Sequence, residues 1–499
     1  MKNSKRILSL ILASMILLSC VSCSDNVSDD GSKETTPSGS NESTGETEPE
    51  SPKYLDDLPD TLRFQDEDVR FIAAYTYNSI TLLEEDDESD IVNEAVWKRN
   101  MAISDRLGVK VTLPREEVTG YDQFNSIVKN SVTSSADDFD VLCGHTRFNI
   151  NLAAEGVLKN LNNMNYIDLT KDYWSQGYND NIGYKGIHYW ATGDLSLEYI
   201  KYIYCMFVNA ELWNDHYSDV NLYDIVKEGK WTLDALAQYA DGAYVDENGN
   251  GDVDNNDSFG IVMQKGHVLN GMAFASNVVY TSYDDDGTPY ISVNNEHTVD
   301  VFTRLHDLFY STSYGRMLEN GDFDGLVEKM FPERHLLFCP NTFIFAENEK
   351  IRDMEDNFYI IPMPKYDETQ NAYRSGQYDG VPIYGVTITA AEDKLDAIGA
   401  TLEAMCSLSS QMVVPVYFDK ALKNKYSRDM ETAEMINIIR DSVVSDFAFA
   451  WGDSVGNLYN LFYDNIQGSE IASKMKPMAK IWTKTMKKLL DQLDAKSGN

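Results

Sequence analysis

The sequence VRFIAAY at Val69–Tyr75 is an almost continuous apolar run and predicts a buried first β-strand. Ser89 is placed to cap the helix that follows, and Gly108 is placed to end it. The apolar side chains of that helix recur on one side at Val92, Val96, Ile103 and Leu107. Next come a strand at Val109–Leu113, a helix marked by Phe124, Ile127, Val128 and Val132, and a strand at Phe139–Cys143. Strands that alternate with helices predict the α/β class, a parallel sheet covered by helices.

The rest of the chain continues this pattern. Further strands are expected at Tyr202–Val208, Ser258–Met263, Leu336–Phe345, Phe358–Pro362 and Pro382–Thr389, with helices after Thr232 and around residues 395–405, 435–439 and 481–493. The chain has 499 residues, which is too long for one ordinary core and predicts two lobes or domains. No second apolar run of about 18 or more residues is present, so no integral membrane domain is expected.

Residues 1–19 have the form of an export signal. Basic residues are followed by the apolar run Ile7–Leu18, which is shorter than the roughly 20 residues that a membrane-spanning helix needs. The sequence LLSC that ends at Cys20 resembles the lipobox of bacterial lipoproteins, which implies cleavage before Cys20 and lipidation of that cysteine. A plain cleaved signal with a chance cysteine is the alternative, and Cys23 is a second candidate for the lipid.

Residues 20–55 are expected to hold the lipid anchor and a solvated tether. The segment Ser24–Lys53 has almost no apolar side chain and cannot bury enough surface to order itself. A tether of about 30 such residues has an r.m.s. reach on the order of 30 Å. The protein carries 42 basic and 80 acidic residues, a net charge of −38. Nucleic acid and anionic lipid headgroups are therefore poor partners for the folded body.

Four cysteines lie beyond the leader, at Cys143, Cys205, Cys339 and Cys406. They are widely spaced and form neither a CxxC motif nor a zinc-binding pattern. Buried free thiols are the expectation, and one or two disulfides are the alternative.

Several stretches, taken in order, resemble the extracellular solute-binding proteins of bacterial ABC importers, in the group that includes maltose-binding protein. They are Trp97–Asn100 before Leu107–Val111, Asp140–Phe148 before Glu155–Leu161, Tyr189–Asp194 before Phe207–Asn209, Val226–Thr232, and Phe358–Lys365. The resemblance implies a two-lobed, hinged α/β fold of the periplasmic-binding-protein type (type II), with a ligand cleft between the lobes. It places the N-terminal lobe at 56–198 plus 340–388 and the C-terminal lobe at 199–339 plus 389–499. The chain is expected to cross between them near Ser196–Tyr204, Leu337–Thr342 and Tyr384–Thr389.

The same resemblance implies a function. A lipid-anchored, extracytoplasmic and monomeric protein would capture a carbohydrate, in particular an oligosaccharide, and deliver it to the permease subunits of an ABC importer. It would touch the bacterial cell membrane only through its lipid anchor, would not bind nucleic acid, and would not be an enzyme.

The sharpest local motif is the loop 246–257, DENGNGDVDNND. Oxygen-bearing side chains stand at loop positions 1, 3, 5, 9 and 12, which are Asp246, Asn248, Asn250, Asp254 and Asp257, and Asp252 at position 7 would offer its backbone carbonyl. This is the spacing of a Ca²⁺ loop, with Gly251 at the sharp turn. Asp257 stands where an EF-hand has Glu, and a strand follows where an EF-hand has a helix. We expect a structural Ca²⁺ clip, and the alternative is an acidic turn without an ion.

Sugars are bound by aromatic faces and by planar polar side chains that bond hydroxyl groups. His145 and Arg147 follow a strand at its carboxyl end, where α/β sheets present ligands. Position along the chain and the resemblance together give seven candidate ligand-binding residues, which are His145, Arg147, Trp190, Asp194, His267, Asn270 and Trp451. The alternative is that Trp190 and Trp451 are core residues and that Arg147 is a surface ion-pair partner.

Three motifs of common enzyme classes are missing. No GxxxxGK[ST], HExxH or GxGxxG occurs. An exported glycan hydrolase stays open, because two carboxylates among the 80 acidic residues could form its catalytic pair. A surface glycan-binding module without transport, and peptide or polyamine ligands, are further alternatives.

Overall fold

The structure is a computed structural model that describes residues 54–74, 90–113, 118, 120–319, 327–418 and 430–496. The chain divides into two compact units, Met1–Lys53 and Tyr54–Asn499. The predictions for the signal, the tether and Cys20 or Cys23 fall on the first unit and lie outside the described residues, as does Ser89.

The first sheet has the strand order β11-β3-β1-β2. Its strands are β1 Glu67–Ala73, β2 Val109–Thr112, β3 Val141–His145 and β11 Pro382–Val386. β1 runs parallel to β2 and β3, and β11 runs antiparallel to β3. The predicted alternation of strands and helices is thus confirmed for the first sheet, with an antiparallel edge strand added from far along the chain.

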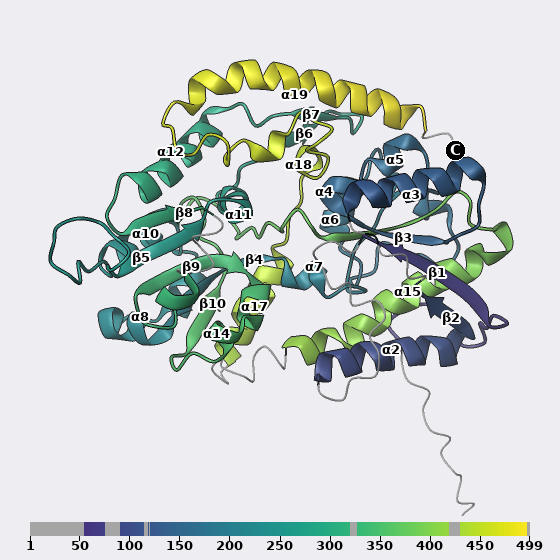
Figure 1. The fold of residues 1–499 in the computed structure, drawn as a ribbon, viewed down its shortest axis with the longest axis horizontal. Helices are drawn as coiled ribbons and strands as arrows, with labels where there is room; N and C mark the ends of the chain where they lie inside the picture. Colours follow the sequence, from purple (N-terminus) through teal and green to yellow (C-terminus); the bar gives the residue numbers. More distant parts are fainter. Residues whose placement is uncertain are drawn as a thin grey trace, which may run out of the picture. The chain divides into compact units, whose positions relative to one another are not determined.

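Helices cover both faces of the first sheet (Figure 1). α2 (Ile91–Leu107) and α15 (Leu395–Met412) share one apolar cluster with Phe71 and Val141. The opposite face, with Ile72 and Leu142, packs with residues of α3 (Tyr121–Ser134). The side chain that caps α2 is Asp90, which accepts hydrogen bonds from the backbone of the first turn. Gly108 ends α2 as predicted, in a left-handed conformation with φ of 63°.

The second sheet has the order β10-β4-β9-β5-β8. Its strands are β4 Tyr204–Asn209, β5 Phe259–Gln264, β8 Gly315–Leu318, β9 Leu336–Thr342 and β10 Phe358–Ile361. The helices packed around it include α8 Ala210–Tyr217, α9 Leu222–Lys227, α10 Leu233–Asp241, α11 His267–Ala275, α12 Glu296–Tyr310, α14 Glu349–Arg352 and α17 Met430–Asp441. Thr232 caps α10 as predicted, by accepting a hydrogen bond from Ala235 N.

Shorter elements and one long helix complete the described chain. They are α4 Thr146–Asn149, α5 Leu152–Glu155, η1 Leu161–Asn163, α6 Gln176–Ile182, α7 Glu198–Lys201, η2 Phe343–Glu347, η3 Glu392–Lys394, α18 Phe447–Ala450, η4 Leu458–Asn460, α19 Ile471–Asp494 and the hairpin of β6 Thr281–Tyr283 with β7 Pro289–Ile291. α19, yellow in Figure 1, contacts α5 beside the first sheet and also contacts α12 and β7.

The expected division into lobes needs two corrections. β9 and β10 pair with β4 in the second sheet, so part of the segment 340–388 belongs with the second sheet. α15 packs against α2 and β1, so part of the segment 389–499 belongs with the first sheet.

The expected chain crossings change accordingly. Ala191 bridges to β11 of the first sheet, and β4, which begins at Tyr204, lies in the second sheet. The chain therefore crosses between them, as expected for Ser196–Tyr204. The crossings expected at Leu337–Thr342 and Tyr384–Thr389 are wrong, because those residues lie inside sheet strands or at their ends. The chain instead passes between sheets within 361–382 and within 412–430. An apolar run predicts a buried strand but does not specify its distant partner.

One described helical segment, Glu392–Phe418, is long and apolar enough to cross a membrane by length and composition alone. It contains α15, and 83% of its most apolar window is buried inside the protein. Its apolar character therefore follows from its place in the core of the first lobe. The four described cysteines are all free and buried, which confirms the expectation of free thiols.

Candidate functional site

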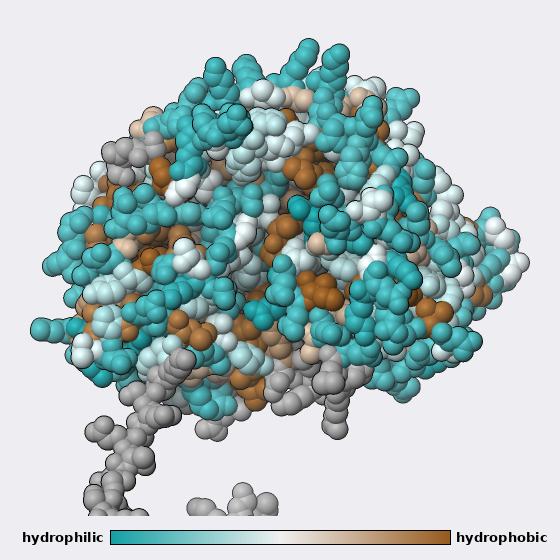
Figure 2. Space-filling view, turned by 180° about the vertical axis from the view of Figure 1, so that it is seen from behind, coloured by the Kyte–Doolittle hydropathy of each residue, from teal (hydrophilic) through white to brown (hydrophobic). Residues whose placement is uncertain are grey.

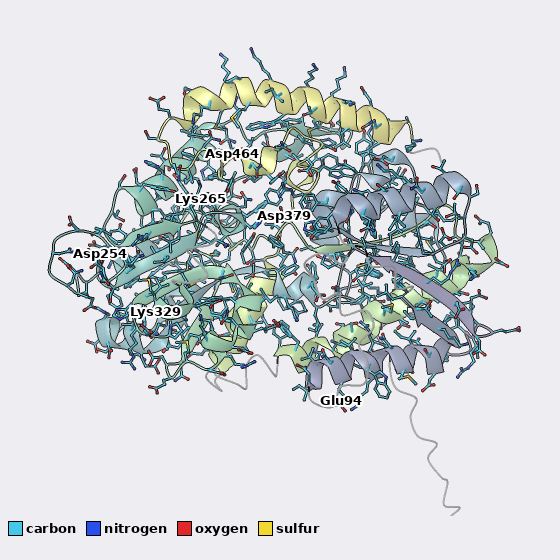
Figure 3. The ribbon with its side chains drawn as sticks, viewed as in Figure 1. Glu94, Asp254, Lys265, Lys329, Asp379 and Asp464 are labelled. Atoms are coloured by element: carbon cyan, nitrogen blue, oxygen red, sulfur yellow. The ribbon has the colours of Figure 1, made fainter. Side chains whose placement is uncertain are left out.

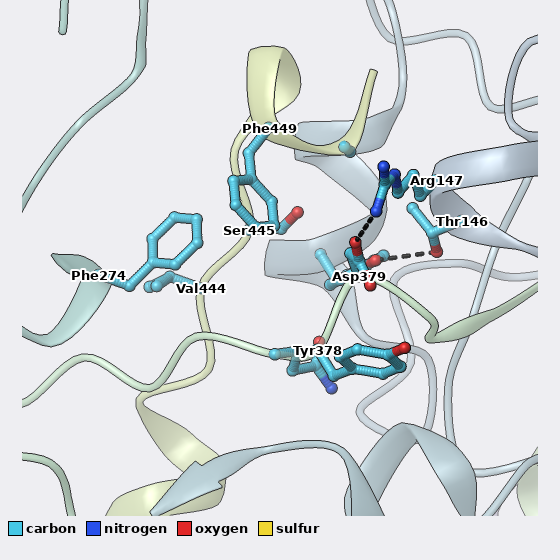
Figure 4. Close-up of a pocket in the computed structure, with 11 residues that line it drawn as sticks. Thr146, Arg147, Phe274, Tyr378, Asp379, Val444, Ser445 and Phe449 are labelled. Carbon is cyan, nitrogen blue, oxygen red and sulfur yellow. Dashed lines mark hydrogen bonds and ion pairs between the residues drawn. The ribbon is translucent and has the colours of Figure 1, made fainter. Parts of the chain in front are cut away.

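A narrow pocket with a cavity volume of about 10 Å³ lies between the two sheets (Figure 4). Its walls come from α4, α6 and α11, from the segment 377–379 before β11, and from the segment 444–450 around α18. The lining residues are Thr146, Arg147, Tyr178, Phe274, Gln377, Tyr378, Asp379, Val444, Ser445, Phe449 and Ala450. Because these segments belong to both lobes and to the connections between them, a movement of one lobe would reshape the pocket.

Asp379 is the central charged group of the pocket. Arg147 donates a hydrogen bond from Nη1 to Asp379 Oδ2 at 3.2 Å, as Figure 4 shows. The other carboxylate oxygen, Oδ1, is buried and accepts no hydrogen bond from the described residues. Its nearest ionisable neighbour is His267, whose Nδ1 lies 3.6 Å away. Asp379 thus presents one satisfied oxygen and one unsatisfied oxygen.

Arg147 is held by more than one partner. Its Nε donates to Asp453 Oδ1 at 3.3 Å, and its Nη2 donates to the Tyr459 hydroxyl. The guanidinium also stacks over the ring of Tyr459, with 3.9 Å to the ring centroid. Burial raises the pKa of Asp453, and the charge of Arg147 opposes that shift. Two carboxylates therefore share one guanidinium, which leaves the pocket with an excess of negative charge.

His145 ends β3 and is not one of the residues that line the pocket. Its ring is surrounded by the rings of Tyr121 and Phe148, with centroids 4.6 and 4.8 Å away. The residue is 4% exposed, and Nδ1 has no hydrogen-bond partner among the described residues. Burial lowers the pKa of His145 to about 4. The imidazole is therefore neutral at pH 7, and its ring meets the ring of Tyr378, which lines the pocket, with 6.3 Å between centroids.

His267 and Asn270 lie on the first turns of α11. The His267 ring meets Tyr378 edge to face, with 4.5 Å between centroids. Burial lowers the pKa of His267. Asn270 is buried, and its Oδ1 has no hydrogen-bond partner among the described residues. Phe274, one turn further along α11, lines the pocket itself.

Three of the predicted ligand-binding residues lie away from this pocket. Trp190 is 2% exposed and donates from Nε1 to the Ile150 carbonyl at 3.1 Å. Trp451 is equally buried and donates from Nε1 to the Ile182 carbonyl at 3.1 Å. Asp194 is buried, and burial raises the pKa of its carboxyl. Both tryptophans therefore have the positions of core residues, which was the alternative to a binding role. Arg147, for which the alternative was a surface ion pair, lines the pocket.

Sequence reasoning missed Asp379 and Gln377. Gln377 is buried and donates from Nε2 to the Tyr199 carbonyl at 2.6 Å, and its Oε1 has no partner among the described residues. No local sequence signal places Asp379 here, because its position follows from the antiparallel pairing of Pro382 of β11 with His145 of β3. The residues that precede β11 therefore meet the carboxyl end of β3, where His145 and Arg147 were expected to present a ligand.

The loop 246–257 adopts a turned conformation with internal hydrogen bonds. Asp246 accepts from Gly249 N at 2.8 Å and from Gly251 N at 2.9 Å. Gly249 and Gly251 both have positive φ, which glycine adopts without strain. Asp257 is buried and its Oδ1 accepts no hydrogen bond from the described residues, while the amide nitrogen of Asn250 faces Asp254. Among the described residues, no group of three or more His, Cys, Asp or Glu side chains is arranged to hold a metal ion.

No protein-family model matches the sequence, and no curated protein matches it. Solved structures do share the fold. The ABC substrate-binding protein Lmo0181 from Listeria monocytogenes, in complex with cycloalternan, superposes with a TM-score of 0.54 at 13% identity, over 84% of this chain and 99% of that chain. A solute-binding protein of an ABC transporter from Thermotoga lettingae TMO, bound with α-D-tagatose, gives 0.52 at 13% identity, over 84% and 100%. UgpB from Mycobacterium tuberculosis, in complex with glycerophosphocholine, gives 0.51 at 13% identity, over 86% and 98%.

These similarities define the class of fold. The described chain has the two-lobed α/β fold of ABC-transporter solute-binding proteins. The predicted fold class is thereby confirmed, and the pocket lies where a cleft between the lobes was expected.

Proposed function

We propose that this protein is the extracytoplasmic solute-binding component of an ABC importer and that it captures a carbohydrate, in particular an oligosaccharide. The observation that carries the proposal is the pocket between the two sheets, in which Asp379 offers a buried, unsatisfied carboxylate oxygen. The solute would be bound there, and closure of the lobes would enclose it.

The chemistry of the pocket suits a ligand that donates hydrogen bonds. Asp379 Oδ1 and Gln377 Oε1 are acceptors without partners among the described residues, and Asn270 Oδ1 is a third beside the pocket on α11. Buried polar atoms are normally satisfied, so such acceptors call for donors from a ligand or water. Sugar hydroxyls are donors of this kind, and the rings of Phe274 and Phe449 supply apolar faces for sugar CH groups.

Two of the similar solved structures hold sugars, cycloalternan and α-D-tagatose, and one holds glycerophosphocholine. A phosphodiester is the weaker candidate for this chain. Asp379 and Asp453 already occupy two sides of Arg147, so a phosphate at this guanidinium would meet two carboxylates. The charge of the pocket therefore favours a neutral sugar.

A calorimetric titration tests the proposal. Purified protein is titrated with an oligosaccharide selected from a thermal-shift screen, since a ligand that binds only the folded state raises its melting temperature. Asp379→Asn should weaken binding by about 10-fold to 100-fold, as expected for the loss of a hydrogen bond to a charged group. Asp464→Asn, at an exposed position away from the pocket (Figure 3), is the matched control and should bind within twofold of the wild type. No melting shift with any sugar, or equal loss in both variants, would contradict the assignment.

We infer that the pocket binds its solute without chemical turnover. A glycosidase needs one carboxyl group that stays protonated and a second that is ionised. Arg147 donates a hydrogen bond to Asp379 in the pocket and another to Asp453 beside it, so both carboxylates are ion-pair partners of one guanidinium in this arrangement. Incubation with chromogenic glycosides should release no chromophore; release that is lost in Asp453→Asn would favour the hydrolase instead.

Lipid anchoring and delivery to a permease complete the proposal. The sequence LLSC supports modification of Cys20, and the tether after it would hold a monomeric body near the extracytoplasmic face of the cell membrane. Growth with labelled palmitate should label the wild type and not Cys20→Ser. Labelling that persists in Cys20→Ser and disappears in Cys23→Ser would move the anchor to Cys23.

We also propose that the loop 246–257 binds Ca²⁺ as a structural clip. Its spacing and the unsatisfied Asp257 Oδ1 support this, and the amide of Asn250 would turn so that its oxygen faces the ion. Ca²⁺ should raise the melting temperature relative to EDTA in the wild type but not in Asp246→Asn. Asp285→Asn, in another exposed acidic turn, should keep the full Ca²⁺ effect. A melting temperature that EDTA does not change would contradict the clip.

A further inference from the structure

The long C-terminal helix α19 carries an unusual charge for this protein. Its exposed side bears six lysines, in a chain whose net charge is −38. They are Lys474, Lys476, Lys480, Lys484, Lys487 and Lys488. Figure 3 shows long side chains that project outward along α19, and Figure 2 shows the same edge as hydrophilic. A concentration of positive charge on one helix creates a positive local potential there, whereas the rest of the protein surface is acidic.

These six lysines have no carboxylate partners within the described part of the chain. Lysines elsewhere on the surface are commonly paired, as in the contacts of Lys129 with Glu155 at 2.7 Å and Lys227 with Glu431 at 2.8 Å. The charge of α19 is therefore available to an external anion, whereas the charge of these other lysines is already compensated.

The geometry of α19 makes the lysines into a stripe. At 3.6 residues per turn, five of them fall within an arc of about 120° and extend over about 18 Å of helix. We call Lys476, Lys480, Lys484, Lys487 and Lys488 the lysine stripe. Trp482, Met486 and Leu489 on the opposite side are buried in the core, so the lysine stripe faces away from the protein. Ile481, at the border of the stripe, is 56% exposed.

α19 is fixed to both halves of the molecule. It contacts α5 beside the first sheet and α12 and β7 on the other side. Near its end, Asp494 accepts from the Tyr184 hydroxyl at 3.0 Å and from Lys185 Nζ at 3.1 Å. A surface that bound the lysine stripe would therefore hold the whole body in a defined orientation.

We propose that the lysine stripe is a docking surface for the anionic phospholipid headgroups of a membrane. A band of ammonium groups along one side of a helix can face a plane of phosphates, and each such lysine near an anionic surface strengthens binding. Exposed Ile481 can enter the headgroup layer beside the row. The remaining acidic surface is repelled by the same lipids, so this edge alone faces the bilayer. This refines the expectation from net charge, which excluded anionic lipid for the body as a whole.

The length of the tether is compatible with this docking. The segment Ser24–Lys53 spans up to about 100 Å when extended, so an anchor at Cys20 and the contact at α19 can engage one membrane. The docking contact itself does not depend on a sugar ligand, and its test omits the lipid anchor.

Vesicle flotation tests the proposal with the chain from Ser24 to Asn499, which lacks the leader and any acyl group and contains the compact unit Tyr54–Asn499. The wild type should float with vesicles of equal phosphatidylglycerol and phosphatidylcholine at about 50 mM salt. It should not float with phosphatidylcholine alone, and about 500 mM salt should release it, because salt screens exposed charges.

Charge reversal locates the contact. The variant Lys480→Glu/Lys484→Glu/Lys487→Glu should bind the anionic vesicles at least tenfold more weakly than the wild type. The control reverses three exposed lysines elsewhere and has the same net charge: Lys110→Glu/Lys329→Glu/Lys350→Glu. It should bind within threefold of the wild type. Circular dichroism and melting temperature establish that each variant is folded.

Three outcomes would overturn the proposal. One is that the wild type fails to float with anionic vesicles at low salt. Another is that both triple variants lose binding equally, which would make net charge and not the lysine stripe responsible. The third is that soluble polyphosphate, at equal phosphate concentration, binds the stripe more tightly than the vesicles do, which would identify a soluble anionic polymer as the partner.

Discussion

Acidification should destabilise this protein through His145. The buried imidazole packs against aromatic rings, and burial lowers its pKa from 6.5 to about 4. Between these two values the unfolded chain binds a proton that the folded protein does not bind. The free energy of unfolding therefore falls as the pH drops through this window, and the contribution of the neutral imidazole is fully present above pH 6.5.

The size of this effect follows from the two pKa values. A tenfold change in a proton-binding constant corresponds to about 1.4 kcal/mol, so the full contribution of the imidazole is about 3 kcal/mol. At pH 5 the unfolded imidazole is almost fully protonated while the folded one is still mostly neutral. The free energy of unfolding should therefore be about 2 kcal/mol lower at pH 5 than at pH 7 through this residue alone.

Urea unfolding followed by tryptophan fluorescence at pH 7 and pH 5 measures the effect. Other groups also titrate in this range, so the informative quantity is the difference between the wild type and His145→Gln. The variant should lose about 2 kcal/mol less than the wild type on acidification. His216→Gln, exposed on α8, is the matched control and should keep the wild-type difference. An unchanged pH dependence in His145→Gln would refute the reasoning.

Two further substitutions distinguish packing from binding. Trp190→Phe removes the hydrogen bond to the Ile150 carbonyl and leaves a small void, so the free energy of unfolding should fall by about 1–3 kcal/mol. Sugar affinity by calorimetry should stay within twofold, and a tenfold loss would return Trp190 to the binding site. Gly260→Ala places a methyl group 2.0 Å from the Ala240 carbonyl oxygen, so β5 must shift and the urea midpoint should drop by the equivalent of about 2 kcal/mol or more. Gly120→Ala is the control, with open space around the new methyl group, and it should leave the urea midpoint nearly unchanged or slightly higher. Equal effects of Gly260→Ala and Gly120→Ala would contradict the close approach of α10 and β5.

Much of the fold was predictable from local patterns. The apolar run at 69–75 supplies residues 69–73 of β1, and the segment 358–362 contains β10. Thr232 caps its helix and Gly108 ends its helix, as predicted. These elements depend on residues close together in the sequence. The partners of β9 and of α15 depend on contacts with segments over 100 residues away, which no local pattern encodes.

The candidate site was predictable only in part. Arg147 lines the pocket and was predicted from its place after the carboxyl end of a strand, where ligands bind. His145, predicted on the same ground, is a buried neighbour of the lining residue Tyr378. Asp379 was missed because its neighbour β11 was expected to be a crossing and not an edge strand beside β3. Trp190 and Trp451 are buried and do not line the pocket. The sequence could not place them, because an indole fits a core as well as a sugar face.

The free cysteines give each lobe its own chemical reporter. Cys143 and Cys406 lie in the cluster around the first sheet, and Cys205 and Cys339 lie in a cluster of the second. Burial raises the pKa of all four thiols, which suppresses their reactive thiolate form. These four thiols should therefore be indifferent to reductants and alkylating reagents in the native protein. Each pair becomes modifiable when its own lobe opens, so mass spectrometry of alkylated peptides can time the unfolding of the two lobes separately.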